Sequence, residues 1–167
     1  MIYLLDADVF IRAKNLHYGM DFCPAFWTWL IRMNRIGKVY SIEEVRKEIQ
    51  AIEDELSHWT TGLHPQFFLH SDLSTVSAGE SVSKWVSNQG YEEQAVHSFL
   101  GKADYHLVAH AYAGKHTVVT HERSSTSTQK IKIPDVCKGL NIKYSTPFKM
   151  LRREEARFVL ERMRSGS

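Results

Sequence analysis

The chain has 167 residues, of which 43% are hydrophobic, 11% aromatic and 24% charged, and its formal net charge is +2. This length suits one globular domain with its own core, and the aromatic content argues against a disordered chain. The longest nearly apolar run is about half of what a bilayer crossing needs, no signal peptide is apparent, and two distant cysteines give no disulfide framework. We therefore expect a soluble, cytoplasmic protein of one domain.

The first part of the chain alternates short apolar runs with amphipathic segments. In chain order, the pattern predicts a buried strand at 2–5, a helix at 9–14, a helix capped by Asp21 and ending near Gly37, and a strand at 38–40. Ser41 with Glu44 has the spacing of a capping box and predicts the start of another helix. The expected core stripe of that helix is Ile42, Val45, Ile49, Ile52 and Leu56.

The second part repeats this alternation after a poorly patterned middle. For residues 58–90 we expect a loop, a short strand at 67–69 and one helix. The predicted elements that follow are helices at 91–100 and 103–113, a β-branched strand at 117–120, a polar loop at 123–129, a helical turn at 135–140 and a strand at 142–144. Short strands alternating with helices favour an α/β fold around a parallel sheet, as one domain over residues 1–167. Its core would span 1–146, followed by an amphipathic helix at 147–164.

Charge is distributed unevenly along the sequence. Residues 1–122 carry 10 Lys and Arg against 15 Asp and Glu, whereas residues 123–167 carry 11 against 4. A basic C-terminal section on an acidic body suits a protein that gathers phosphate groups, and it equally suits a solvated basic helix. The arginines at 152, 153, 157, 162 and 164 would steer RNA or pair with an acidic partner, and the sequence does not separate these readings.

Four acidic residues lie where a crevice is expected. Asp6 ends the first strand and Glu122 follows the strand at 117–120, and the carboxyl ends of parallel strands line the ligand crevice of an open sheet. Asp104 lies in the first turn of its helix on the core-facing side, and Glu48 lies at the edge of a core stripe. Taken singly, each position also fits a turn former, a helix cap or a solvent-exposed acid.

Carboxylates that converge repel one another, so their pKa values rise unless a cation joins them. Oxygen ligands without a histidine or cysteine set select Mg²⁺ or Mn²⁺ over zinc, and such a centre suits phosphodiester hydrolysis. The sequence therefore suggests a carboxylate-bound Mg²⁺ or Mn²⁺ site.

These acids lie within four segments that resemble the motifs of PIN-domain ribonucleases, especially the VapC-like toxins of toxin–antitoxin pairs. The segments are Leu5-Asp6-Ala7-Asp8-Val9-Phe10, Ser41–Ile49 with its acid at Glu48, Ala103-Asp104-Tyr105-His106-Leu107-Val108-Ala109-His110-Ala111, and Val118-Val119-Thr120-His121-Glu122. They occur in the family's order. Two positions depart from the pattern, because Asp8 stands where Asn, Ser or Thr is usual and Glu122 stands where Asp or Asn is usual.

The resemblance implies a three-layer PIN-like fold and a Mg²⁺- or Mn²⁺-dependent endoribonuclease that serves as the toxin of a bacterial or archaeal toxin–antitoxin pair. It implies that Asp6, Glu48, Asp104 and Glu122 are the catalytic metal ligands, with Asp8 and Thr120 as accessory residues. The implied partners are an RNA substrate, a cognate antitoxin protein and a second copy of the chain, with no membrane. The two departures leave open an alternative: a PIN-like module with an impaired centre that binds nucleic acid or a protein partner.

Other site types have weaker support in the sequence. The Asp6-Ala7-Asp8-Val9 segment also fits the first motif of haloacid-dehalogenase-like phosphatases, but the later acid pair of that fold is absent. His106 and His110 have zinc-ligand spacing, yet without a glutamate between them a solvated helix face is expected. The serines lack a nucleophile-elbow motif, and no glycine-rich loop points to a nucleotide cofactor. Four tryptophans, at 27, 29, 59 and 85, are expected to be core or interface anchors rather than base-stacking groups.

Overall fold

A parallel sheet of five strands forms the centre of the computed structural model, which describes residues 1–161. The strands are short and lie in the order β3-β2-β1-β4-β5, with every neighbouring pair parallel. Their bounds are β1 Tyr3–Leu5, β2 Val39–Ile42, β3 Phe68–Leu69, β4 Thr117–Val119 and β5 Tyr144–Ser145. Strands buried on both faces have continuous apolar sequences, and β1 is fully buried over its whole length.

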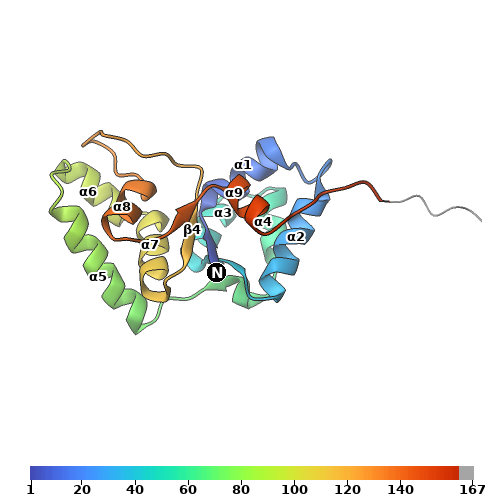
Figure 1. Cartoon of the computed structure of the whole chain (residues 1–167), viewed down its shortest axis with the longest axis horizontal. Coiled ribbons are helices and arrows are strands. Elements are labelled where there is room, and N and C mark those ends of the chain that lie inside the picture. Colours follow the sequence, from blue (N-terminus) through green and yellow to red (C-terminus); the bar gives the residue numbers. More distant parts are fainter. Residues whose placement is uncertain (162–167) are drawn as a thin grey trace, which may run out of the picture.

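Helices surround the sheet in two groups (Figure 1). On one side lie α1 (Ala7–Arg12), the π-helical turn η1 (Ala13–His17), α2 (Pro24–Arg35), α3 (Glu43–Gln50), α4 (Glu55–Thr61) and, near the C-terminus, α9 (Pro147–Arg153). A short 3₁₀ turn, η2 (Pro65–Phe67), leads into β3. At the other end gather α5 (Leu73–Ser87), α6 (Glu93–Leu100), α7 (Ala103–Gly114) and α8 (Ile133–Gly139). Helix α3 of the first group contacts α7 of the second. The predicted α/β architecture with a flanked parallel sheet is confirmed.

The strand order contains one reversal. The chain adds β2 and β3 on one side of β1, and then returns to place β4 and β5 on the other side. In open parallel sheets, ligands bind outside the carboxyl ends of the strands at such a reversal point. The segments that leave β1 and β4 therefore meet at the position where a functional site is expected.

Two predicted helix starts are wrong. Asp21 does not cap α2, because Pro24 occupies its first position, Cys23 is the residue before it, and Phe22 is exposed. Proline fixes the backbone angle that a first helical turn needs, so the helix begins there. Ser41 is part of β2, where it is buried and its Oγ donates a 2.6 Å hydrogen bond to the carbonyl of Leu5.

The predicted long stripe from Ile42 to Leu56 is divided between two helices. α3 ends at Gln50, Ile52 is exposed, and α4 starts afresh from a capping box in which Asp54 and Ser57 bond reciprocally to each other's backbone amides. Asp54 satisfies amides that would otherwise lack partners, which stabilises a new helix start at this position. The loop and short strand expected in the middle segment are present, and α5 is the helix expected there.

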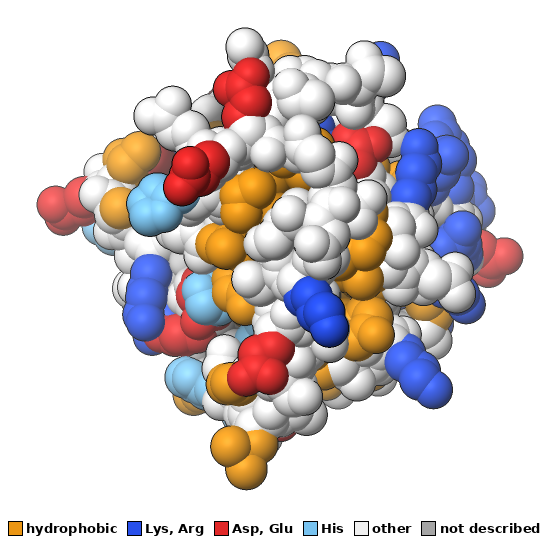
Figure 2. All heavy atoms as spheres, turned by 90° about the vertical axis from the view of Figure 1, so that its left-hand side faces the viewer, with side chains coloured by type: hydrophobic (Ala, Val, Ile, Leu, Met, Phe, Trp, Pro, Cys, Tyr) orange, Lys and Arg blue, Asp and Glu red, His pale blue; other side chains and the backbone are white. Residues whose placement is uncertain are grey.

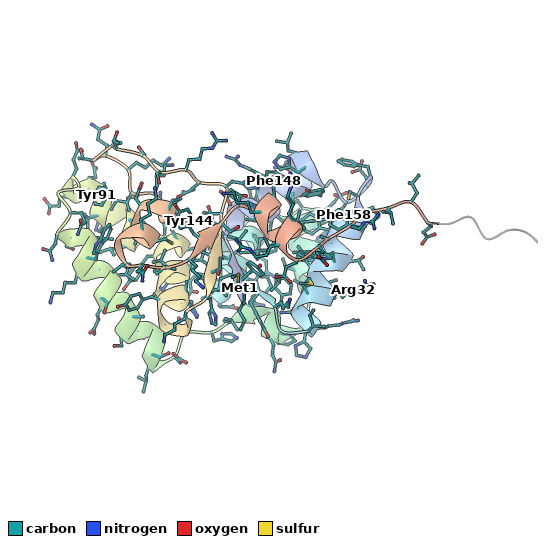
Figure 3. All side chains as sticks on the ribbon, viewed as in Figure 1. Met1, Arg32, Tyr91, Tyr144, Phe148 and Phe158 are labelled. Atoms are coloured by element: carbon teal, nitrogen blue, oxygen red, sulfur yellow. The ribbon has the colours of Figure 1, made fainter. Side chains whose placement is uncertain are left out.

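The C-terminal helix is shorter than predicted. α9 ends at Arg153 in a Schellman motif: Glu155 is left-handed (φ 54°), and the amide of Ala156 donates to the carbonyl of Leu151 at 2.9 Å. The expected helix over 154–161 is therefore wrong, and its last residues, with Arg162 and Arg164, lie outside the described residues. The segment after α9 instead crosses α2, where Phe158 packs edge-on against Tyr18 and Phe26 (Figure 3).

The core lies on both faces of the sheet and contains a group of aromatic side chains beneath α1, α2 and α4. Trp27 is buried and packs edge-on against Phe26 and Trp59, while Trp29 and Trp85 lie partly buried against the core. The expectation that the tryptophans are anchors is confirmed. Among residues 1–161, none of the helices has the length and apolar character that a bilayer crossing requires.

Candidate functional site

Asp6 lies at the reversal point of the sheet, immediately after β1. Its Oδ1 accepts a 2.7 Å hydrogen bond from the amide of Ala7 and so caps α1, and its Oδ2 accepts one of 2.9 Å from the hydroxyl of Thr120. The carboxylate is only 5% exposed. Asp6 is thus both a helix cap and a fixed acidic group at the carboxyl end of the central strand.

Thr120 joins the two sides of this crevice. It follows β4, is buried, and its amide donates to the carbonyl of Ser145 at 3.0 Å. Its hydroxyl donates to Asp6 and accepts a 3.1 Å hydrogen bond from the amide of Glu122. One buried hydroxyl therefore sets the distance between the acid after β1 and the chain after β4.

Glu122 performs a structural task as well. Its Oε2 accepts a 2.8 Å hydrogen bond from the amide of Ile133, the first residue of α8, whose cap position is Lys132 and offers no side-chain bond. A glutamate has one more methylene than an aspartate, which gives it this additional reach. Of its two carboxylate oxygens, Oε2 is engaged with α8.

Asp8 lies two residues beyond Asp6, in the first turn of α1. Its side chain is partly buried, and Oδ1 is 3.4 Å from the amide nitrogen of His121 in a long hydrogen bond. Burial raises its pKa, although the hydrogen bond from the amide of His121 and the charge of Arg12 oppose the rise. Asp8 is therefore close to the crevice and contacts the chain that leaves β4.

Asp104 and Glu48 approach the crevice from α7 and α3. Asp104 is the second residue of α7, whose N-cap position is Lys102, so Asp104 does not cap its own helix. Glu48 lies on the exposed rim. Asp104 also lines a cavity of about 30 Å³ together with Lys102, Gln129 and Lys130, which is roughly the volume of one water molecule.

The acidic side chains are close enough to perturb one another. Burial, and then the charges of Glu122 and Glu48, raise the pKa of Asp104 to about 6. Burial, and then the charges of Asp8 and Asp104, raise the pKa of Asp6 well above its ordinary value. Partial desolvation also raises the pKa of Glu48, although Lys102 opposes it. These mutual shifts describe a single acidic cluster with basic residues at its rim.

This cluster has the donor chemistry for Mg²⁺ or Mn²⁺, because hard divalent ions prefer carboxylate oxygens and relieve the repulsion among them. Within residues 1–161, however, no three acidic, histidine or cysteine side chains are already arranged to hold one metal ion. The structure therefore places the predicted acids near enough to raise one another's pKa, without drawing their oxygens to one point.

Sequence reasoning failed for one histidine of α7. His110 is buried rather than on a solvated face, its Nε2 lies 3.4 Å from the hydroxyl oxygen of Ser71, and burial lowers its pKa. The reason is that α5 lies along α7 and covers this side of the helix. His106 remains partly exposed, 3.9 Å from Glu44.

A second group beside the crevice has no counterpart in the sequence prediction. The rings of His17, His121 and Phe148 contact one another, and burial together with the charge of Arg12 lowers the pKa of His121 to about 4. His121 is therefore neutral at physiological pH. The three residues are far apart in the sequence, so no local pattern could have revealed their contact.

The comparisons with known proteins identify a family and a fold. A family model described as a domain of unknown function, DUF4411, matches residues 3–158. The chain belongs to this family. Among curated proteins, the DUF4411 chain has no match. Among solved structures it resembles a chain of the crystal structure of VapBC2 from Rickettsia felis bound to a DNA fragment from their promoter, with a TM-score of 0.57 and 14% identity over 87% of this chain and 98% of that one.

At this identity, the likeness concerns the fold. It supports the PIN-like α/β architecture expected from the four motifs. The site chemistry is a separate question, which depends on the side chains of this chain.

Proposed function

We propose that this DUF4411 protein is a Mg²⁺- or Mn²⁺-dependent endoribonuclease and the toxin of a toxin–antitoxin pair. The observation that supports the proposal is that, beyond the effect of burial, the charges of Asp104 and Glu122 raise the pKa of Asp6, and those of Glu122 and Glu48 raise the pKa of Asp104, where the strand order of the sheet reverses. Each residue comes from a different motif, and the motifs occur in the order of the ribonuclease family. Acidic groups whose pKa values are strongly raised by burial and by one another are typical of functional sites.

The roles of the individual residues follow from their positions. Asp6 is buried and the pKa of Asp104 is raised by its acidic neighbours, so these two would hold a divalent ion, with Glu48 and Oε1 of Glu122 completing its carboxylate ligands. Such an ion, when bound, activates water for attack on phosphorus and offsets the charge that develops on the phosphate. Thr120 holds Asp6 in orientation, and Asp8 adds negative charge beside it.

The surrounding surface suits a polyanionic substrate. Lys102, beside Asp104 and Glu48, lies where a cation attracts the RNA backbone. Figure 2 shows further Lys and Arg side chains gathered along the right-hand edge of the face that it displays. Basic side chains of this kind favour binding of a polyanion such as RNA.

A protein partner is part of the proposal. The structural neighbour comes from a VapBC2 structure, and exposed apolar side chains on this chain, such as Leu16, Phe22 and Leu160, offer contact area to another protein. We propose that this partner is an antitoxin. We also propose that the chain forms a homodimer.

The test is cleavage of a mixed RNA pool with Mn²⁺, followed by repetition with Asp104→Asn. Removing a carboxylate ligand is expected to lower the initial rate at least about 100-fold, the scale of losing one major electrostatic contact in a transition state. Glu53→Gln is the matched control, because Glu53 is an exposed acid on the loop before α4 and should leave the rate unchanged. Equal rates of cleavage by the wild type and Asp104→Asn would show that this acidic cluster is not the catalytic site.

A second function is favoured by one specific observation. Oε2 of Glu122 is engaged with Ile133, and no three acids in the described range are already gathered around one point. A PIN-like module that binds RNA or a protein partner without cleaving RNA would not need its acids to be arranged around a metal ion. If no RNA is cleaved with either metal while RNA still binds, this alternative replaces the nuclease.

A further inference from the structure

Three rings form a small cluster beside the acidic crevice, which we refer to as the His–Phe cluster: His17, His121 and Phe148. The rings of His17 and His121 are stacked, with centroids 5.5 Å apart and planes inclined by 27°. Phe148 stands edge-on to both, at 5.1 Å from His17 and 5.6 Å from His121. All three side chains are partly exposed, so the cluster is accessible from solvent rather than part of the core.

The topology of the sheet brings the three rings together. His17 lies on the segment that leaves β1, His121 on the segment that leaves β4, and Phe148 on α9, which follows β5. Figure 3 shows Phe148 between α9 and α1, above the central strands. The cluster therefore lies at the same end of the sheet as the carboxylates. Each ring comes from the chain that follows one of three adjacent strands, β1, β4 and β5.

The backbone that carries His17 is unusual. It is the last residue of the π-helical turn η1, in which the amide of Tyr18 donates to the carbonyl of Ala13 at 2.7 Å. Single π-turns are rare and occur frequently at functional sites, because they redirect a side chain that a regular helix would place elsewhere. Here the turn directs His17 onto His121.

Positive charge adjoins the rings. Arg12 is close enough for its charge to help lower the pKa of His121 and to oppose the rise that burial causes in the pKa of Asp8. Arg152 follows Phe148 by four residues on α9, so the two share a helix face, and Arg152 is exposed. Flat rings beside guanidinium groups are the combination that binds single-stranded nucleic acids, because bases stack on the rings while cations contact the backbone.

We propose that the His–Phe cluster is a stacking subsite for an unpaired nucleobase of the RNA, next to the phosphodiester that the acidic cluster addresses. This inference rests on the proposed function, and it names the substrate class as single-stranded RNA. The link to the acids is direct, because the amide of His121 is 3.4 Å from Oδ1 of Asp8 and the next residue is Glu122. A base inside a duplex has its faces covered by its neighbours and cannot use such a subsite.

The experiment is equilibrium binding of a fluorescein-labelled oligouridine to the wild-type protein in EDTA, with the same strand annealed to oligoadenine as the duplex probe. EDTA removes the divalent ion, so binding is measured without cleavage. His17→Ala and Phe148→Ala are each expected to weaken binding of the single strand about fivefold or more, the scale of one lost base stack. Binding of the duplex should change by less than about twofold, because its phosphate contacts remain.

Conservative variants separate stacking from a structural role. His17→Phe and Phe148→Trp keep a flat ring and should bind the single strand like the wild type, whereas a loss of folding would lower binding of both probes and the thermal midpoint. If the wild type does not bind the single strand, or if the alanine variants weaken both probes equally in a folded protein, the subsite does not exist. If the alanine variants weaken binding of the single strand but the wild type cleaves no RNA in Mn²⁺, the nuclease proposal alone is refuted. If the wild type cleaves RNA but the alanine variants bind the single strand as the wild type does, the subsite alone is refuted.

Discussion

Thr120 donates a 2.9 Å hydrogen bond to Oδ2 of Asp6, although the two residues are 114 positions apart in the sequence. Both are buried, and the same hydroxyl accepts the amide of Glu122. The bond links the two strands between which the sheet reverses its order. The orientation of the most buried acid in the crevice is therefore set by a residue with no charge of its own.

Replacing Thr120 with Val tests this relationship. Valine has the same shape, so packing is kept while Asp6 and the amide of Glu122 both lose a partner. We expect the free energy of unfolding to fall by about 1–3 kcal/mol and RNA cleavage to slow by about tenfold or more, measured by urea denaturation and initial rates. Thr120→Ser retains the hydroxyl and should behave like the wild type; a valine variant with unchanged cleavage would show that this bond does not orient the acid.

The acidic cluster should cost stability when no cation is present. The pKa of Asp104 is raised to about 6 from its ordinary value of 3.8, so the folded state binds its proton more tightly than the unfolded chain does. For an acid with a raised folded pKa, stability decreases as the pH rises through the interval between the two values. In EDTA at pH 7.5, Asp104→Asn is therefore expected to be more stable than the wild type by about 1–3 kcal/mol.

The pH dependence provides the control for this variant. At pH 4 the folded wild type already holds the proton on Asp104, so the difference from Asp104→Asn should shrink. Denaturant titrations at both pH values measure it. An Asn variant that is less stable than the wild type at pH 7.5 would mean that Asp104 makes a favourable interaction in the metal-free protein.

Divalent ions should reverse the cost of the cluster. An ion that binds only the folded state stabilises it by about 2.7 kcal/mol at 100 times its dissociation constant. We expect Mn²⁺ to raise the thermal midpoint of the wild type, EDTA to restore the original value, and Asp6→Asn to abolish the response. Glu53→Gln, outside the crevice, should keep it. A midpoint that Mn²⁺ does not change would argue for the binding module over the nuclease.

A different acid should stabilise the protein with the opposite pH dependence. Glu154, just after α9, accepts hydrogen bonds from Lys38 Nζ at 2.5 Å and from the hydroxyl of Tyr3 at 2.9 Å. The bond from Lys38 is the main reason that the pKa of Glu154 is lowered. For an acid with a lowered folded pKa, the stabilisation is complete above its unfolded pKa, near 4.5, and is lost as the pH falls through the folded value.

Glu154→Gln is accordingly expected to lower the free energy of unfolding by about 1 kcal/mol at pH 7, and by progressively less below pH 4.5. Urea denaturation as a function of pH measures both quantities. Glu155→Gln is the matched control, because Glu155 is the neighbouring acid and makes no side-chain hydrogen bond to the described residues. A constant difference at all pH values would show that the charge of Glu154 is not the stabilising factor.

The sequence predicted the parts of this fold that depend on local pattern. The apolar run before Asp6 and the β-branched run before Thr120 form β1 and β4, and the position of Asp104 on the core-facing side of its helix leads to the crevice. Local signals failed where two patterns coincide. Ser41 fits a capping box, but its hydroxyl can equally bond to a neighbouring strand, and burial beside Leu5 favours the strand.

Other features depend on distant parts of the chain and leave no local trace. His110 is buried because α5 covers it, and α9 ends at Arg153 before a left-handed Glu155, without the glycine that usually marks such an end. The contact of His17 with Phe148 joins residues on the segments after β1 and β5. Such contacts follow from the order of the strands, which composition and periodicity do not specify.

The hydrogen bond from Ile133 to Glu122 closes a ring of chain. Residues 123–132 run from the glutamate back to an amide that its own carboxylate holds, and Asp135 and Lys138 of α8 fasten the loop further through Ser125 and Ser124. A cation bound by Oε1 alone would leave the hydrogen bond between Ile133 and Glu122 intact, whereas a cation bound by both oxygens would break it. The rate at which a protease cleaves the segment 123–132, measured with and without Mn²⁺, would thus show whether Glu122 keeps its hydrogen bond to Ile133 when a metal ion binds.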